Sequence, residues 1–334
     1  MTLTHRERLQ ACLSNSPALD RPPVALWRHF PVDDQDPSTL AEAVLDFQRH
    51  YDFDLVKVTP ASSYSIKDWG VEDAWEGHTE GTRTYTKRAI TVPQDWERLP
   101  VLSPDAHHLS GHLDCLRRIR AELLSHTPLL VTIFSPLAQA KNLAGGDRLM
   151  DHIHSHPQAV LKGLGTIAQT TRQYIEACME VGIDGIFYAV QHAQAELLSL
   201  DEYKLFGLPN DLICLEPVGS LWCNLLHLHG LNIHFELVSQ SLYPDGLFQI
   251  VNWHDRETRP SLAEGLKDSR VAVCGGISQK TIVFGDQAAV RKEAADAIDQ
   301  SGGRRFILGT GCVVLIIAPH GNISTARQFV ESVR

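Results

Sequence analysis

The chain has 334 residues, of which 43% are hydrophobic and 21% charged, a composition typical of globular proteins that bury a large core. Its 30 basic and 40 acidic residues give a net charge of −10 and a sequence pI near 5.9, which argues against a nucleic-acid partner. Apolar runs fall short of the roughly 18 residues that span a bilayer, and seven scattered cysteines, an odd number, favour a reducing compartment, so we expect a cytoplasmic protein.

Short apolar runs alternate along the chain with longer amphipathic stretches, which is typical of parallel βα units. Strands are predicted at 23–27, 55–59, 129–135, 185–190, 223–228, 247–253, 271–275 and 306–309. Helices are predicted at 38–50, 113–125, 157–181, 199–206, 211–218 and 288–300. Most strands are continuous valine, isoleucine and leucine runs, as expected when both faces of a strand are buried. Eight such runs favour a closed (β/α)₈ TIM barrel over an open sheet.

Residues 70–100 have a different pattern from the rest of the chain. They are rich in threonine and show little helical periodicity, so we predict a β-hairpin insertion after the second strand. The sequence contains no repeat, low-complexity tract or linker that would divide it. We therefore predict a single domain over residues 1–334.

Polar and titratable side chains follow the predicted strands, at the carboxyl end where barrel enzymes place their active sites. The candidate site residues are Arg28, His29, Lys57, Tyr188, Gln191, His192, His227, His229, His254, Asp255 and Cys312. The alternative for the set as a whole is that these are ordinary polar loop residues.

Three of these residues have the side-chain chemistry of a metal site. His227 and His229 are two apart on an extended segment, so both imidazoles face the same side. Cys312 follows Gly309 and Gly311, which let the backbone turn and direct the thiol inward. Two imidazoles and one thiolate are a zinc ligand set with one open position. The alternatives are hydrogen-bonded buried histidines and a small core cysteine.

The remaining candidates offer charge or acid–base chemistry. His254 and Asp255 form either an acid–base pair or a loop-capping contact. Arg28, next to His29, presents a fixed positive charge for a carboxylate or phosphate, unless a nearby aspartate neutralises it. Lys57 interrupts an apolar strand, which favours a buried partner or a functional role over a surface position.

Several motifs resemble the uroporphyrinogen decarboxylase superfamily, with matches over nearly the whole chain. They are Val273-Cys-Gly-Gly-Ile-Ser278, Phe306-Ile-Leu-Gly-Thr-Gly-Cys312, Ala318-Pro-His-Gly-Asn-Ile323 and the opening strands Pro23-Val-Ala-Leu-Trp-Arg28 and Phe53-Asp-Leu-Val-Lys57. The resemblance implies a (β/α)₈ barrel with its site in the cleft at the carboxyl ends of the strands.

One branch of this superfamily decarboxylates uroporphyrinogen without a cofactor. Its first-strand motif carries two arginines, of which Arg28 matches the first while the second is missing here. Its second strand ends in an aspartate that faces the pyrrole nitrogens, and the matching stretch here is Lys57-Val-Thr59. Decarboxylation of uroporphyrinogen or a related carboxylated substrate is therefore the alternative function, with Arg28 binding a carboxylate and His29 or His254 protonating the product carbon.

The other branch contains zinc-dependent cobamide methyltransferases, whose motifs are His-x-Cys-Gly after the fifth strand and Gly-Cys after the eighth. This chain has His227-Leu-His229-Gly230 and Gly311-Cys312, with a histidine in place of one cysteine. The resemblance implies that zinc binds at His227, His229 and Cys312, and that a methyl group moves between a corrinoid or another methylated donor and a thiol-type acceptor.

In this interpretation the corrinoid is carried by a partner protein, and the enzyme acts as a monomer or homodimer. The catalytic residues are His254, Arg28 and Lys57, and the substrate-binding residues are His29, Tyr188, Gln191, His192 and Asp255. A third, non-enzymatic hypothesis is a tetrapyrrole-binding or corrinoid-binding protein whose barrel has lost turnover.

Overall fold

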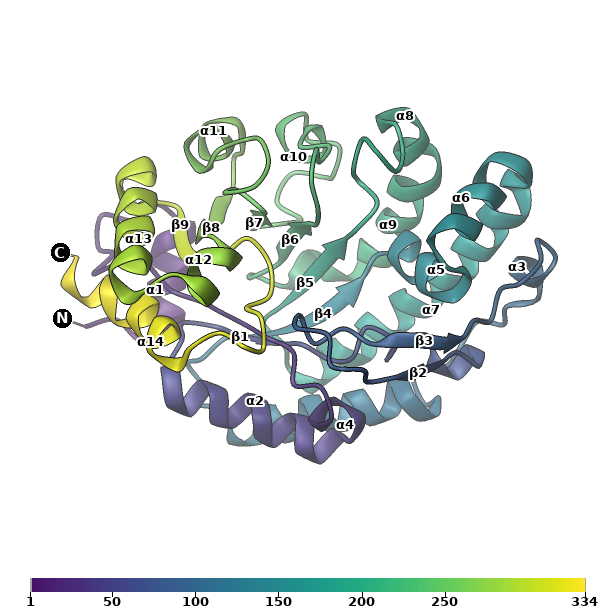
Figure 1. The fold of residues 1–334 in the computed structure, drawn as a ribbon, viewed down its shortest axis with the longest axis horizontal. Coiled ribbons are helices and arrows are strands. Elements are labelled where there is room, and N and C mark those ends of the chain that lie inside the picture. The colour runs from purple at the N-terminus through teal and green to yellow at the C-terminus, as the bar shows by residue number, and fades with distance from the viewer. Residues whose placement is uncertain (1, 334) are drawn as a thin grey trace.

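A curled sheet of seven parallel strands forms the centre of the structure, a computed structural model that describes residues 2–333 (Figure 1). In sheet order the strands are β1 (Val56–Val58), β4 (Leu129–Phe134), β5 (Gly185–Val190), β6 (Leu225–Leu228), β7 (Ile250–Trp253), β8 (Ala272–Ile277) and β9 (Phe306–Thr310). Every residue of these strands is buried, which explains their continuous apolar sequences. Because all neighbours run parallel, the carboxyl ends of the seven strands meet at one edge.

Seven of the eight predicted strands are present, with ends that differ from the prediction by at most three residues. The eighth, at residues 23–27, does not form a strand: only Val24 makes an isolated parallel bridge, to Leu308. The reason is local, since Pro22 and Pro23 have no N–H to donate and the Val24 N–H donates to the Asp54 carboxylate at 2.8 Å. A side chain thus replaces the backbone acceptor that a strand would use.

Residues 23–27 nevertheless lie between the two ends of the sheet. On one side the Ala25 N–H donates to Leu308 O at 2.9 Å and the Leu308 N–H donates to Pro23 O at 2.8 Å. On the other side the Asp54 N–H, just before β1, donates to Val24 O at 2.9 Å. These hydrogen bonds connect β9 to the start of β1 through an irregular segment.

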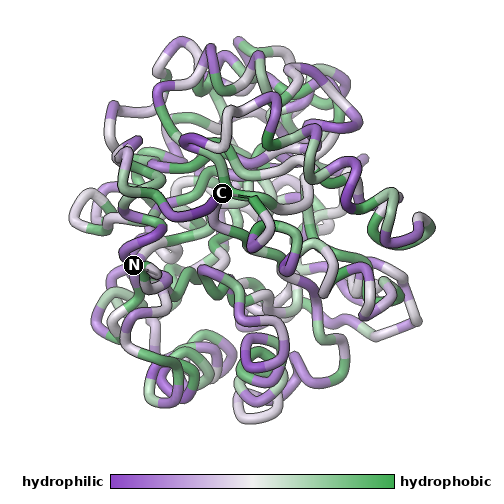
Figure 2. Tube along the Cα trace, turned by 90° about the vertical axis from the view of Figure 1, so that its left-hand side faces the viewer, coloured by the Kyte–Doolittle hydropathy of each residue, from purple (hydrophilic) through white to green (hydrophobic). Residues whose placement is uncertain are grey.

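Helices surround the sheet, and the two termini lie on the same side of the molecule (Figure 1). The longer helices are α1 (His5–Leu13), α2 (Pro37–Tyr51), α4 (His107–Glu122), α5 (Pro136–Ala144), α6 (Gly146–Ser155), α7 (Pro157–Val181), α9 (Leu208–Leu215), α13 (Gln287–Ser301) and α14 (His320–Phe329). The shorter ones are α3 (Asp95–Arg98), α8 (Leu200–Glu202), α10 (Glu236–Ser239), α11 (Leu262–Asp268) and α12 (Gln279–Phe284). Figure 2 shows apolar segments running through the middle of the molecule, with polar and apolar residues alternating along its outer parts.

Local sequence signals explain where the longest helices begin and end. The Asp36 carboxylate accepts from the Ser38 N–H at 2.8 Å, and Pro37 occupies the first turn of α2. Helix α7 ends at Gly182, whose positive φ of 89° favours glycine. Predicted helices match α2, α7 and α13 closely and overlap α4 and α9, which begin six and three residues earlier than predicted, whereas residues 199–206 form α8 followed by a π-helical turn.

Residues 70–100 contain an antiparallel pair of strands, β2 (Glu72–Ala74) and β3 (Thr84–Lys87), which form a sheet of their own. The Arg83 Nε donates to Asp73 Oδ1 at 2.7 Å and ties the two strands together. This hairpin follows β1 and brings Tyr85 and Arg88 to the carboxyl edge of the main sheet. Between residues 2 and 333, the structure has no helix with the length and apolar character needed to cross a membrane.

Candidate metal centre and the surrounding cavity

Three histidines and one cysteine meet at the carboxyl edge of the sheet. His227 is in β6, His229 follows it, His254 follows β7 and Cys312 follows β9. Their ligand atoms all lie within 4.8 Å of one another. The His229 Nδ1 is 3.6 Å from the Cys312 Sγ and 3.4 Å from the His254 Nε2. Two ligands of one tetrahedral zinc ion lie about 3.3 to 3.8 Å apart, so the cluster fits such an ion without a large rearrangement.

Burial sets the protonation of these four side chains in the metal-free protein. It lowers the pKa of His229 to about 3 and that of His254 to about 4, and it lowers the pKa of His227 well below its usual value. The imidazoles are therefore neutral near pH 7, each with a nitrogen lone pair available. Burial raises the pKa of the Cys312 thiol to about 12, so this sulfur needs a nearby cation to become a thiolate ligand.

Asn252 fixes the orientation and tautomer of His227. The Asn252 Nδ2 donates to Cys274 O at 2.8 Å and to Thr310 O at 3.1 Å, so its Oδ1 must face the ring. The His227 Nδ1 lies 2.6 Å from that oxygen and therefore carries the proton. This leaves the His227 Nε2 as the free lone pair, which is the arrangement of a metal-ligating histidine held by an outer partner.

We expect the Asn252→Leu variant to bind zinc about 10-fold to 100-fold more weakly than the native chain, since His227 loses the acceptor that orients it. Competition titration with a chromophoric chelator measures this change. Asn224→Leu is the matched control, because Asn224 is also fully buried, hydrogen bonds two backbone carbonyls and lies near the amino end of β6. Equal zinc affinities of the two variants would contradict the role of Asn252.

The cluster opens into a cavity of about 710 Å³. Its lining includes most of the residues predicted from the sequence, namely His29, Lys57, Gln191, His192, His227, His229 and Cys312. His254 joins this set through its contact with His229. The predicted residues from six separate segments thus lie in or beside a single cavity.

Three predicted residues do not line this cavity: Arg28, Tyr188 and Asp255. Alternation along extended segments explains the first two, because Trp27 and His29 face the cavity and Arg28 points the other way, as does Tyr188 between Phe187 and Ala189. The Tyr188 hydroxyl instead donates to Asp211 Oδ1 at 2.6 Å in the core. The Asp255 carboxylate accepts from the Gly276 N–H at 3.1 Å.

Lys57 supplies a positive charge deep in the cavity. Its Nζ lies 4.4 Å from the centre of the Phe187 ring and donates to Thr59 Oγ1 at 3.1 Å. Within the described chain it forms no ion pair with a carboxylate. Burial lowers the pKa of Lys57 to about 7, so the amine loses its charge as the pH rises through neutrality.

The cavity wall also contains buried polar atoms that lack a hydrogen-bond partner within the described chain. They are Trp27 Nε1, His29 Nδ1 and His192 Nδ1. A buried donor or acceptor without a partner is costly unless a water or ligand satisfies it. These three atoms are themselves buried, so they lie within the wall and do not face the open cavity.

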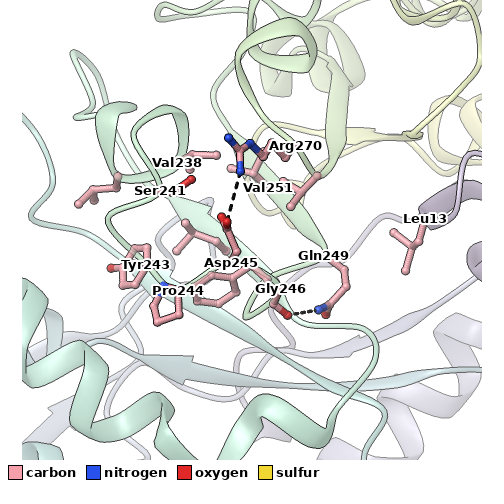
Figure 3. A pocket seen from close by; sticks show the side chains of 14 residues that line it. Leu13, Val238, Ser241, Tyr243, Pro244, Asp245, Gly246, Gln249, Val251 and Arg270 are labelled. Carbon is pink, nitrogen blue, oxygen red and sulfur yellow. Dashed lines mark hydrogen bonds and ion pairs between the residues drawn. The ribbon is translucent and has the colours of Figure 1, made fainter.

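A second hollow of about 370 Å³ lies elsewhere, beside β6 and β7, and Figure 3 shows its lining. Most of its side chains are apolar, and its charged residues neutralise each other, with Arg270 Nη1 donating to Asp245 Oδ2 at 3.2 Å. The Gln249 amide similarly donates to Gly246 O at 2.6 Å. With its polar groups already paired, this hollow offers no reactive group, in contrast to the histidine–cysteine cavity.

Sequence reasoning missed several functional candidates. Asn252 lies near the end of a predicted strand, and the sequence does not distinguish it from an asparagine with a purely structural role. Arg88 follows β3 and Lys141 belongs to α5, so neither directly follows a strand of the main sheet. The only sequence signal for Lys141 was the Ser135-Pro136 helix start after β4, which places the following turns near the same edge.

Comparison with known proteins assigns the family. Residues 5–334 match the family described as "Uroporphyrinogen decarboxylase (URO-D)". The chain belongs to the uroporphyrinogen decarboxylase family. Relatives named "Uroporphyrinogen decarboxylase" from Rhodococcus opacus (strain B4) and Sorangium cellulosum (strain So ce56) are 26% and 24% identical, over 52% and 71% of this chain. The matches span 49% and 66% of those two proteins.

Solved structures show the same fold for this uroporphyrinogen decarboxylase family member. A methyltransferase from Methanosarcina mazei has a TM-score of 0.84 at 19% identity and covers 99% of both chains. A B12-independent methionine synthase from Shewanella sp. W3-18-1 has a TM-score of 0.61 at 14% identity, covering 94% of this chain and 93% of its own. The resemblance to this family noted from the motifs is therefore confirmed.

Proposed function

We propose that this family member is a zinc-dependent methyltransferase, which moves a methyl group between a corrinoid or other methylated donor and a thiol-type acceptor. The observation that carries the proposal is the cluster of His227, His229, His254 and Cys312 within 4.8 Å, facing a substrate-sized cavity. The structural likeness to proteins named methyltransferase and methionine synthase supports it. We also infer that residues 23–27 act as the eighth strand and complete a (β/α)₈ barrel.

In this proposal His227, His229 and Cys312 hold the zinc ion, and Asn252 keeps the His227 Nε2 directed toward it. Zinc, when bound, supplies a Lewis acid that favours the thiolate form of an acceptor thiol. The neutral His254 imidazole lies beside His229 and accepts the thiol proton. Removal of that proton leaves a thiolate, whose sulfur attacks the methyl carbon as the bond between this carbon and the donor breaks and the donor keeps the electron pair.

The remaining cavity residues orient the substrate and exclude water. The Lys57 ammonium pairs with an anionic substrate group below about pH 7, where it keeps its proton. Trp27 and Phe187 pack edge to face at 5.2 Å between ring centres and form the apolar part of this wall. His29, Gln191 and His192 line the same space.

A methyl-transfer assay tests the proposal. The zinc-loaded chain is incubated with methylcobalamin and a panel of small thiols, and the methylated thiol is measured by mass spectrometry. We expect turnover that a chelator removes and added zinc restores. Absence of turnover with every thiol, from a protein shown to contain zinc, would count against a thiol acceptor.

Decarboxylation is the second candidate, because the curated relatives carry the name uroporphyrinogen decarboxylase and the cavity contains unpaired cations. Such an enzyme needs no metal. Loss of carbon dioxide from uroporphyrinogen by the chelated protein would therefore favour this candidate and overturn the first. Tight tetrapyrrole binding without metal or product would instead indicate a binding protein.

A further inference from the structure

Positive charge is concentrated in the cavity and is mostly unpaired. Four lysine or arginine side chains line it: Lys57, Arg83, Arg88 and Lys141. Of these, only Arg83 forms ion pairs with carboxylates of the described residues, to Asp73 at 2.7 Å and to Asp34 at 3.4 Å. In a chain with ten more acidic than basic residues, three unpaired cations in one cavity require an explanation.

Arg88 and Lys141 form a pair of their own, apart from Lys57. The Arg88 guanidinium lies 4.1 Å from the centre of the Tyr85 ring, and its Nη1 donates to Asn142 O at 2.6 Å. This bond fixes Arg88 against the residue that follows Lys141 in the last turn of α5. The other Arg88 nitrogens and the Lys141 amine have no partner among residues 2–333.

The two charges are close enough to interact with each other and with the metal centre. Lys141 is an exposed residue whose amine is partly shielded from water, and this shielding, followed by the charge of Arg88, lowers its pKa. Burial and the charge of His254 are the larger causes of the lowered pKa of His229, and the charge of Lys141 adds to them. Burial is the larger cause of the lowered pKa of His192, and the charge of Lys141 again adds to it. Arg88, Lys141, His192 and His229 all line the same cavity.

Two unneutralised cations at close range repel each other, and the repulsion is relieved when an anion binds between them. Glu80 and Asp147 also line the cavity, but neither is within ion-pair distance of Arg88 or Lys141. Arginine offers planar paired donors to an oxyanion and lysine a point charge, the combination used for carboxylate and phosphate groups.

We propose that Arg88 and Lys141 form an oxyanion subsite, which binds a carboxylate or phosphate group of the substrate at the hairpin side of the cavity. The inference deepens the proposed function, since it relies on this cavity being the active site. Binding of the anion itself does not require zinc. The two ideas can therefore fail separately.

Anion binding to the metal-free chain tests the subsite. Titration calorimetry at constant ionic strength uses methyl phosphate in one arm and propionate in the other, so that the preferred anion indicates the source of the oxyanion. We expect Lys141→Gln to weaken association with the preferred anion by about fivefold to tenfold. Arg88→Gln should weaken it similarly, and Arg88→Lys, which keeps the charge, should restore part of the affinity.

Two further variants act as controls. Lys292→Gln removes the same charge from an exposed position on α13, across the molecule from α5 (Figure 1), and should leave binding unchanged. Lys57→Met removes the other cation that the proposed function assigns to the substrate, and should weaken anion binding less than Lys141→Gln does. The proposal is overturned if neither anion binds the native chain, if Lys141→Gln binds as tightly as the native chain, or if Lys57→Met weakens binding more than Lys141→Gln does. Zinc content, measured in parallel, reports separately on the metal centre.

Discussion

Replacing Cys312 with alanine is expected to reduce the zinc content from about one ion per chain to nearly none. Cys312 provides the only sulfur of the cluster, and its Sγ lies 3.6 Å from His229 Nδ1. Without it, three neutral imidazoles remain, which lack the negative charge that a thiolate contributes to zinc affinity. Metal analysis of the purified proteins by plasma mass spectrometry measures the difference.

Cys223→Ala is the matched control for this experiment. Cys223 is also fully buried, and it lies at the amino end of the region that forms β6, whereas His227 lies toward the carboxyl end. The control should keep its zinc and have a similar loss of core packing. Zinc retained by Cys312→Ala, or absent from the native chain, would return Cys312 to the role of a core residue and make the decarboxylase the leading candidate.

Asp54→Ala is expected to lower the free energy of unfolding by about 3 kcal/mol, because Arg8 keeps only Asp20, and Arg21 only the exposed Glu331, as a counter-ion. The Asp54 side chain is fully buried and accepts from Arg8 Nη1 at 2.6 Å and Arg21 Nη1 at 2.7 Å. It also accepts from the Val24 N–H at 2.8 Å. One carboxylate thus joins α1, the irregular segment at residues 23–27 and the start of β1.

Equilibrium unfolding in urea, followed by circular dichroism, measures this loss of stability. Asp46→Ala serves as the control, since Asp46 pairs with Arg49 on an exposed face of α2 and its removal should change the midpoint little. If Asp54→Ala unfolded at the same urea concentration as the native chain, the central role of this carboxylate would be wrong.

The sequence allowed the regular part of the fold to be predicted, but not its closure. Continuous apolar runs located β4, β5 and β9 almost to the residue, because strands buried on both faces have little freedom in composition. The run at residues 23–27 is also apolar, but Pro22 and Pro23 lack an N–H, and a carboxylate from residue 54 accepts the Val24 N–H. A side chain 30 residues away is invisible to a pattern that reads only local composition.

The structure brings together the predicted residues that follow a strand, but not those whose place depends on side-chain direction. His227, His229 and Cys312 were predicted from spacing and from family motifs, and the structure places their ligand atoms together. Arg28 and Tyr188 were also placed near strand ends, but each lies one residue out of phase with the cavity-facing positions. Whether a residue faces the cavity depends on the alternation of side chains along the extended segment. The register that fixes this alternation comes only from the three-dimensional structure.

The hairpin that carries Arg88 has a consequence for how this family diversifies. Its strands β2 and β3 pair only with each other, so residues can be inserted, deleted or exchanged there without shifting the register of the parallel sheet. The proposed metal ligands, in contrast, are tied to β6, β7 and β9. Evolution can therefore alter what the cavity accepts through a replaceable module while the reactive centre stays fixed, and exchanging this hairpin between relatives is a direct route to new substrate ranges.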